Sequence, residues 1–345
     1  MSIEQFIEKM PKVELHVHLE GSIRAETLIK LAQKNQVDLP AKSIEDLHQW
    51  YTFTDFPHFI EIYRYFARCL RSAEDIELIT REFLIGQAKQ HILYSEVTYT
   101  PYSQYLANHI PFEEQLAAIT SARSWASQAL GVEMGLVLDI SRDVTPQEGC
   151  ITAEWAVGSM DKGVVALGLG GNEIGNPPEK FVKAFQIAQG AGLPAVPHAG
   201  ETGSADSIWG ALNALHAVRI GHGVRCLEDA ALVERLRAEQ IPLEICPTSN
   251  VCLKVVSNLA EHPLPQLMQN GLMVTINSDD PPMFNTTLSR EYQQIAATFA
   301  FTQDQIEAFV LNALQGSFLP DEQKKNMRNE FRSAFQILSA GNSFA

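Results

Sequence analysis

Strand-like and helix-like segments alternate along this chain in a pattern that predicts a closed parallel (β/α)8 barrel of the TIM-like type. Short, largely apolar, β-rich segments recur, and most of them end in polar residues or glycine. Amphipathic stretches with a helical period lie between most of these segments. Eight strands that alternate with helices favour a closed barrel over an open sheet. The expected strands span residues 13–18, 92–100, 132–140, 164–171, 193–201, 219–224, 241–248 and 273–280.

Length and composition indicate a globular protein of one domain. The chain has 345 residues, of which 46% are hydrophobic and 19% charged, and one α/β barrel with insertions can contain all of them. We therefore expect a single domain over residues 1–345. A long insertion after the first strand, over about residues 24–91, is expected to form a helical lid over the barrel mouth. Its aromatic part, residues 50–66, either grips a planar substrate or packs as a small core of its own.

Charge, cysteine content and the first residues restrict the partners and the compartment. The formal net charge is −15 at pH 7 and we find no basic stripe, so nucleic acid is not an expected partner. Five cysteines without a Cys-x-x-Cys pair indicate reduced thiols rather than a disulfide framework. No apolar run reaches the ~18 residues that span a bilayer, and no secretory signal pattern is present. We expect a cytoplasmic protein without a membrane partner, and the sequence does not predict its oligomeric state.

Two histidines at the end of the first expected strand are the first candidate site residues. His16 and His18 are two residues apart, so on a strand they point to the same face. A His-x-His pair alone is a weak motif, because histidines are often structural. The C-terminal ends of all the strands of a barrel, however, meet at one mouth. His198, at the end of the fifth expected strand, and Asp279, at the end of the eighth, should lie at the same mouth.

These four side chains form a donor set suited to zinc. Three imidazoles and one carboxylate supply nitrogen and oxygen ligands. A metal ion held by them lowers the pKa of a bound water from 15.7 to about 7 and so supplies hydroxide at neutral pH. The structural alternatives are satisfied histidines, and a helix cap for Asp279 and Asp280 ahead of Pro281. The histidines expected not to be ligands are His48, His58, His91, His109, His216 and His262.

Five separate sequence blocks carry a family resemblance. Their order and spacing resemble those of the adenosine deaminase family within the amidohydrolase superfamily, over nearly the whole chain. The resemblance implies an enzyme that replaces the 6-amino group of a purine with oxygen and releases ammonia. The blocks are His16-Val17-His18-Leu19-Glu20-Gly21, His198-Ala199-Gly200-Glu201, Gly221-His222-Gly223, Cys246-Pro247-Thr248-Ser249-Asn250 and Ser278-Asp279-Asp280-Pro281.

The resemblance also implies a metal count and catalytic roles. The end of the fourth expected strand, residues 167–171, has no lysine or glutamate that could bridge two metals, so one zinc ion is expected. Glu201, kept protonated by burial, gives a proton to purine N1. His222 orients the attacking hydroxide and stabilises the charge of the tetrahedral intermediate, and Asp279 acts both in catalysis and as a ligand. The implied zinc ligands are His16, His18, His198 and Asp279.

The remaining implied residues contact the substrate. Asp280, in its protonated or shared-proton form, hydrogen-bonds purine N7, and the backbone N–H of Gly171 meets N3, where the missing Cβ lets the ring approach closely. His18 lies beside the substrate as well as the metal. Glu20 stands where family members that act on adenosine usually have Asp, at the position that contacts the ribose 5′-hydroxyl.

Two departures from the family pattern decide which substrate we expect. The first, Glu20 in place of Asp, argues away from plain adenosine. The second is Asn172 in Gly170-Gly171-Asn172-Glu173, a block that nevertheless resembles the Gly-Asp-Glu form of adenosine deaminases more than the Ser-Ser-Glu form of adenine deaminases. We expect adenosine or 2′-deoxyadenosine, deaminated to inosine or 2′-deoxyinosine in purine salvage. The alternatives are adenine deamination to hypoxanthine, a 5′-modified adenosine such as aminodeoxyfutalosine, an amidohydrolase acting on a cyclic amide, and a purine-binding protein without catalysis.

Overall fold

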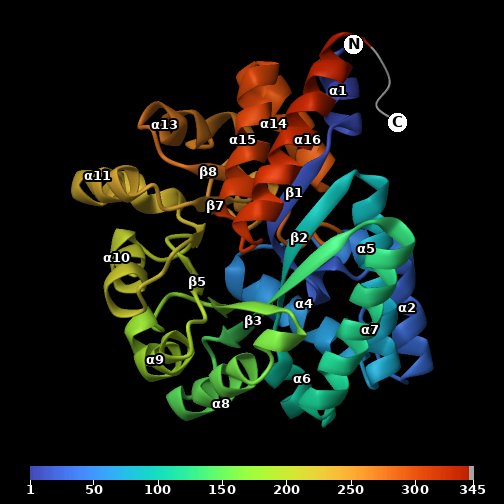
Figure 1. Ribbon diagram of the computed structural model, residues 1–345. Helices are drawn as coiled ribbons and strands as arrows, with labels where there is room; N and C mark the ends of the chain where they lie inside the picture. Colours follow the sequence, from blue (N-terminus) through green and yellow to red (C-terminus); the bar gives the residue numbers. More distant parts are fainter. Residues whose placement is uncertain (342–345) are drawn as a thin grey trace.

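The computed structural model describes residues 1–341, and in it eight parallel strands form a barrel surrounded by helices (Figure 1). The strands pair in sequence order from β1 to β8. A bridge between Val17 and Asp279 joins the last strand to the first. The (β/α)8 barrel predicted from the sequence is confirmed. The strands are β1 (Lys12–His18), β2 (Ile92–Tyr99), β3 (Glu133–Ser141), β4 (Val164–Gly170), β5 (Ala195–Ala199), β6 (Ile220–His222), β7 (Leu243–Ile245) and β8 (Val274–Ile276).

The later strands are shorter than the sequence pattern predicts. The expected strands at 193–201 and 273–280 end at Ala199 and Ile276 in the structure. Backbone conformation explains the early end of β6, because its last residue, His222, has a φ angle of 60°. This left-handed region is unfavourable for residues other than glycine and does not continue a strand. Several candidate site residues therefore lie at strand ends or just beyond them.

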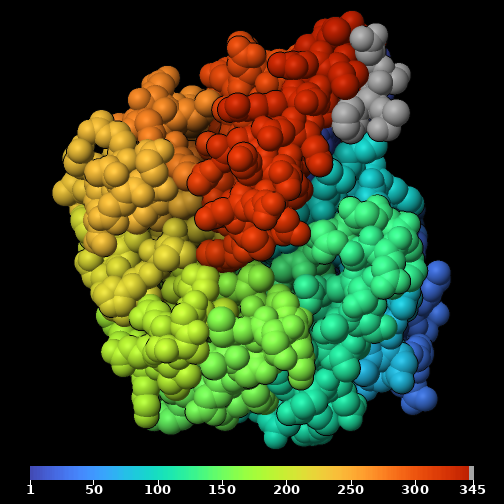
Figure 2. Space-filling model, viewed as in Figure 1, coloured from blue at the N-terminus to red at the C-terminus, as the bar shows by residue number. Residues whose placement is uncertain are grey.

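Helices surround the barrel, and the first of them lies against the last. The N-terminal helix α1 packs against α14 and α16, with the rings of Phe6 and Phe335 5.8 Å apart. In the space-filling view the red C-terminal helices cover the middle of one face, between the teal and yellow parts of the ring (Figure 2). No helix within residues 1–341 is both long and apolar enough to cross a membrane. The helices outside the insertion are α1 (Ile3–Lys9), α6 (Pro101–Asn108), α7 (Phe112–Leu130), α8 (Pro146–Val157), α9 (Val182–Gly190), α10 (Ala205–Ala214), α11 (Ala230–Glu239), α12 (Pro247–Cys252), α13 (Leu264–Gln269), α14 (Leu288–Phe299), α15 (Gln303–Gly316) and α16 (Asp321–Ser339).

The insertion after β1 forms four helices, and its aromatic side chains are divided between the lining of a cavity and the hydrophobic core. Phe59 and Tyr63 line the cavity at the barrel mouth, whereas Phe53 and Phe66 belong to the buried core. The Phe59 ring also stacks on Phe284, with centroids 5.6 Å apart. Helix α5 packs against α7 and β2, so α4 is the part of the insertion that reaches the cavity. The four helices are α2 (Ala25–Lys34), α3 (Ile44–Trp50), α4 (Phe56–Cys69) and α5 (Ala73–Lys89).

Candidate active site

The four residues expected to bind zinc lie together at the barrel mouth. Their donor atoms all lie within 4.8 Å of one another, and all four side chains are buried. Asp279 Oδ1 is 3.5 Å from His16 Nε2 and 3.3 Å from His18 Nε2, and the Nε2 atoms of His18 and His198 are 3.1 Å apart. Four donors around a zinc ion at ~2.0 Å are about 3.3 Å from one another. The spacing of this cluster therefore suits one metal ion.

The hydrogen bonds behind the cluster leave the correct ring nitrogens available. Nδ1 of His16 bonds Glu244 Oε2 at 2.8 Å, and Nδ1 of His198 bonds the carbonyl oxygen of Leu169 at 3.1 Å. Each ring then carries its proton on Nδ1, and Nε2 faces the cluster with a lone pair. Within residues 1–341, His16 Nε2 is buried and has no hydrogen-bond partner. An otherwise costly buried acceptor of this kind is satisfied by a metal ion, so the residues fit one.

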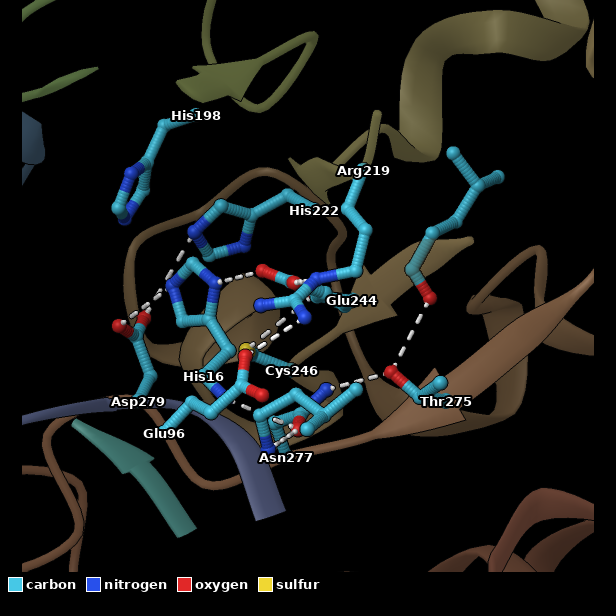
Figure 3. A network of polar contacts seen from close by, with 12 residues as sticks. His16, Glu96, His198, Arg219, His222, Glu244, Cys246, Thr275, Asn277 and Asp279 are labelled. Atoms are coloured by element: carbon cyan, nitrogen blue, oxygen red, sulfur yellow. Dashed lines mark hydrogen bonds and ion pairs between the residues drawn. The ribbon is translucent and has the colours of Figure 1, made fainter. Parts of the chain in front are cut away.

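A charged network that the sequence did not reveal lies beneath His16. Figure 3 shows the His16 ring between Asp279 on one side and Glu244 on the other, with Arg219 next to Glu244 and Glu96. The Arg219 guanidinium donates to Glu244 Oε1 at 2.6 Å and pairs with Glu96 Oε2 at 2.6 Å. Although burial alone raises the pKa of Glu244, Arg219 and His16 hold it below its usual value. Glu244 therefore stays ionised and fixes the orientation of the His16 ring.

Glu201 lies in the loop after β5, and a second carboxylate holds that loop in place. Glu173 accepts backbone N–H bonds from Gly200, Glu201, Thr202 and Gly203 at 2.8 to 3.2 Å. The Glu201 side chain itself is buried, and its Oε1 has no partner among the described residues. Burial, followed by the charges of Asp279 and Glu173, raises the pKa of Glu201 well above its usual value. Glu201 is thus a buried carboxyl group whose raised pKa favours the protonated form that its expected role requires.

His222 lies at the end of β6 and is held by a chain of polar side chains. Asn250 Nδ2 is 3.4 Å from His222 Nδ1, and His262 Nε2 is 3.1 Å from Asn250 Oδ1. If Asn250 donates to Nδ1, the proton of His222 is on Nε2. That nitrogen is 3.9 Å from Asp279 Oδ2 and 3.8 Å from Glu201 Oε2. Burial lowers the pKa of His222 to about 4, so the ring is neutral. The sequence predicted that His262 is not a metal ligand. In the structure it contacts Asn250, which in turn contacts His222.

Two glycines shape the space around the substrate side of the cluster. A Cβ at Gly21 would lie 1.6 Å from Asp280 Oδ1, so a larger residue would displace the Asp280 carboxyl group. Gly171 has a φ angle of 92°, a conformation that side chains strongly disfavour, and it lines the cavity. Asp280 is buried, and its Oδ1 has no hydrogen-bond partner within residues 1–341. Asp280 and Gly171 therefore both line the cavity, and Asp280 has a buried oxygen that a ligand could contact.

Glu20 lies in a short 3-10 helix, Glu20–Ser22, because β1 ends at His18. It is buried, and both of its oxygens have protein partners. Oε1 accepts from the backbone N–H of Thr100 at 3.1 Å, and Oε2 from the Tyr63 hydroxyl at 3.4 Å. Burial raises the pKa of Glu20. This residue ties the first strand to β2 and to the α4 helix at the rim of the cavity.

Asp139 in β3 is a cavity residue that the sequence analysis did not select. It is 3% exposed and lines the same cavity as Glu20, Glu201 and Asp280. Burial raises its pKa to about 7. A lone carboxylate inside an apolar strand gives little signal in one sequence, but it needs an explanation when it is buried.

The cavity that joins these residues has a volume of about 570 Å³, a size typical of small-molecule sites. The α4 helix covers one side of it. Arg64 of α4 and Asp143, which follows β3, form an ion pair of 2.6 Å across the rim. A second group of possible ligands overlaps the first, since Cys246 and His222 lie near His16 and Asp279. Only the first group contains the His-x-His pair and His198.

Comparisons with known proteins agree with this geometry. Residues 11–334 match the family described as adenosine deaminase. An adenine deaminase from Crocosphaera subtropica is 38% identical over 325 residues, which cover 94% of this chain and 99% of that protein. The crystal structure of an adenine deaminase from Arthrobacter aurescens matches with a TM-score of 0.90 and 33% identity, over 95% of this chain and 99% of the other. A structure of an amidohydrolase from Burkholderia ambifaria with bound Zn matches with a TM-score of 0.92 and 26% identity, over 99% and 95% of the two chains.

Proposed function

This chain belongs to the adenosine deaminase family of hydrolytic deaminases that act on C–N bonds, and we propose that it converts free adenine to hypoxanthine and ammonia. The observation that carries the choice of adenine is the likeness to two adenine deaminases, at 38% and 33% identity over almost the whole of each chain. Deamination of a 6-aminopurine, the reaction predicted from the sequence, is supported. Adenosine as the substrate is not confirmed, and the alternative, adenine, fits these relatives better.

The surroundings of Glu20 support a base rather than a nucleoside. Its two carboxylate oxygens are engaged by the Thr100 N–H and the Tyr63 hydroxyl. A ribose 5′-hydroxyl at this position would have to compete with both partners. Because a buried hydrogen bond is costly to leave unmade, Glu20 is better placed to hold the rim closed than to receive a sugar.

We propose that one zinc ion is bound in the cluster of four donors. The residues that would hold it are His16, His18, His198 and Asp279. The chemistry that such a site supplies is a lower pKa for water, from 15.7 toward about 7, and hence a nucleophile at neutral pH.

The other residues of the site bind the purine and move its protons. Glu201 holds a proton beside N1 and transfers it as water adds to C6, which makes C6 more electrophilic. His222 orients the attacking water through Nε2 and stabilises the charge that develops on oxygen. Asp280 contacts N7 and the Gly171 N–H contacts N3, so the ring cannot rotate in the cavity. As the C6–N6 bond breaks, the proton of the new C6 hydroxyl passes to the amino group, which leaves as ammonia, and the other proton of the water restores the Glu201 carboxylic acid.

The test is a comparison of substrates with the purified protein. Values of kcat/KM from ammonia release are measured for adenine, adenosine, 2′-deoxyadenosine and aminodeoxyfutalosine. We expect adenine to exceed each nucleoside by at least about 100-fold, since missing or displaced polar contacts are discriminated strongly. A nucleoside that equals or exceeds adenine overturns the choice of base, and binding of purines without ammonia release overturns the reaction. Metal analysis should find one zinc per chain.

A further inference from the structure

Asp139 is a carboxyl group of the cavity that has no hydrogen-bond partner within residues 1–341 and no role in the proposed reaction. Its Oδ1 is buried, and no donor within residues 1–341 bonds it. The ionisable groups that affect it most are His18, Glu20 and Arg142, and no hydrogen bond joins Asp139 to any of these three, all of which lie within the described part of the chain. A buried carboxyl group without a partner is unfavourable for folding, and such groups persist where a ligand uses them.

The neighbouring strand is built around the Asp139 carboxyl group. Asp139 pairs with Gly168 of β4 in the strand register. A Cβ at Gly168 would lie 2.5 Å from Asp139 Oδ1, and a Cβ at Gly170 would lie 2.7 Å from Oδ2. Any side chain at either glycine would therefore displace the carboxyl group. The two glycines keep it over the end of β4, next to Gly171.

The order of the strands indicates which edge of the purine Asp139 faces. In the proposed arrangement Glu201, after β5, contacts N1, and Gly171, after β4, contacts N3. The next nitrogen along this edge of the purine is N9. The next strand round the barrel is β3, which carries Asp139 near its C-terminal end. Asp139 is thus the residue that the topology brings to N9.

We propose that Asp139 accepts a hydrogen bond from the N9–H of free adenine and thereby selects the base over purines substituted at N9. The inference rests on the proposed function. Free adenine carries a hydrogen on this ring nitrogen, whereas a nucleoside carries a sugar carbon and has no donor there. With a nucleoside bound, the buried carboxyl group would remain unpaired. Sites that leave a polar group unpaired in this way reject the wrong substrate by about 10⁴-fold or more.

The experiment compares adenine with 9-methyladenine, which lacks only the N9–H and adds one methyl group. For the wild-type protein we expect a ratio of kcat/KM on the order of 10⁴ in favour of adenine. In Asp139→Ala the ratio should fall to about tenfold, through a large loss for adenine and little change for 9-methyladenine. Asp139→Asn, which keeps one acceptor oxygen, should lie between the two. Asp161→Asn, an exposed Asp to Asn change, serves as the control and should keep the wild-type ratio.

Thermal unfolding separates this role from a structural one. Because no residue within 1–341 donates a hydrogen bond to Asp139, we expect Asp139→Asn to keep or raise the Tm. Equal losses for both substrates, or a wild-type enzyme that deaminates both at similar rates, overturn the role of Asp139 and leave the deaminase function standing. If the wild-type protein releases ammonia from neither purine, the proposed function fails, and the role of Asp139 fails with it. If Asp139→Ala does not fold, the ratio in Asp139→Asn decides.

Discussion

The barrel interior contains two layers of buried charge that are satisfied in opposite ways. In the lower layer, Arg219 forms ion pairs of 2.6 Å with Glu96 and Glu244, so each carboxylate faces a cation, although Glu96 Oε2 and Arg219 Nη2 make no hydrogen bond within residues 1–341 (Figure 3). In the mouth layer, by contrast, Asp139, Glu201 and Asp280 each have a buried oxygen to which no atom of residues 1–341 donates a hydrogen bond, and no Lys or Arg of those residues forms an ion pair with any of the three. Both layers are removed from water, so the difference is not one of exposure. The difference indicates that the lower layer stabilises the fold, and that the mouth layer leaves polar oxygen atoms unpaired for contact with a ligand.

The largest effect on activity should come from removing the acidic proton of Glu201 in the mouth layer. In Glu201→Gln we expect kcat to fall by about 10² to 10⁴-fold, because an amide cannot donate a proton to N1 in the way a carboxylic acid can. The zinc content should stay at the wild-type value, since the four ligands remain. The measurements are the rate of ammonia release and metal analysis. Glu234→Gln, on the exposed surface of α11, is the matched control, and near-wild-type activity of Glu201→Gln would contradict the assignment.

The second prediction breaks the lower layer. Arg219→Met leaves Glu96 and Glu244 as buried carboxylates without their cation, so we expect the free energy of unfolding to fall by about 3–5 kcal/mol. Urea unfolding measures this change. The control is Arg235→Met, which removes a partly exposed ion pair with Glu239 and should cost about 1 kcal/mol or less. A loss no larger than that of the control would mean that the lower layer does not stabilise the fold.

A third change tests whether the two layers communicate through His16. Glu244→Gln removes the charge that the His16 Nδ1–H faces at 2.8 Å, so the ring becomes a weaker ligand. We expect zinc affinity to fall by about 10 to 100-fold. Competition with a chelator of known affinity measures it. Zinc affinity equal to that of the wild type would show that the lower layer supports the fold alone.

The last prediction concerns a buried titratable side chain that belongs to neither layer. Among the described residues, Lys12 at the start of β1 donates only to the carbonyl oxygens of Met10 and Gln90, and burial lowers its pKa from 10.5 to about 7. Between these two pH values the unfolded chain binds a proton that the folded chain has lost. The free energy of unfolding therefore contains a term that rises by about 1.4 kcal/mol per pH unit between about pH 7 and 10.5.

The variant Lys12→Met lacks that term. We expect the difference in stability between Lys12→Met and the wild type to favour the variant most near pH 7 and to shrink as the pH rises. Urea unfolding at pH 7.5, 8.5 and 9.5, with Lys9→Met on the exposed end of α1 as the control, measures the slope. A pH-independent difference would mean that Lys12 does not titrate in this range.

Much of the fold and of the metal cluster could be predicted because both follow from local patterns. Strand and helix periods repeat along the chain, and one barrel rule then brings His16, His18, His198 and Asp279 to the same mouth. The lower layer could not be predicted in this way. Arg219 and Glu244 are single charges beside apolar strands, and their pairing depends on the register of β6 and β7, which places Gly221 opposite Glu244.

The cavity residues Asp139 and Glu20 were harder to interpret from the sequence, for a different reason. Asp139 differs from its neighbours only in being charged, and the signal that could have selected it lies on another strand, at Gly168 and Gly170. Glu20 stood out as a departure from the family pattern, but its partners Tyr63 and Thr100 become neighbours only after α4 folds over the mouth. Specific contacts between distant segments, rather than local periods, therefore decide the substrate.

The seam between β1 and β8 has a consequence for how the site forms during biosynthesis. Asp279 N donates to the carbonyl oxygen of His16 at 3.1 Å, and His18 N donates to that of Asp279 at 2.9 Å. The side chain of Asn277 holds the amide of His16 across the same seam, 261 residues away in sequence. Closing so long a loop is entropically slow. The donor cluster is therefore completed only after the ribosome has delivered the last strand, and a nascent chain holds only part of this cluster until the barrel closes.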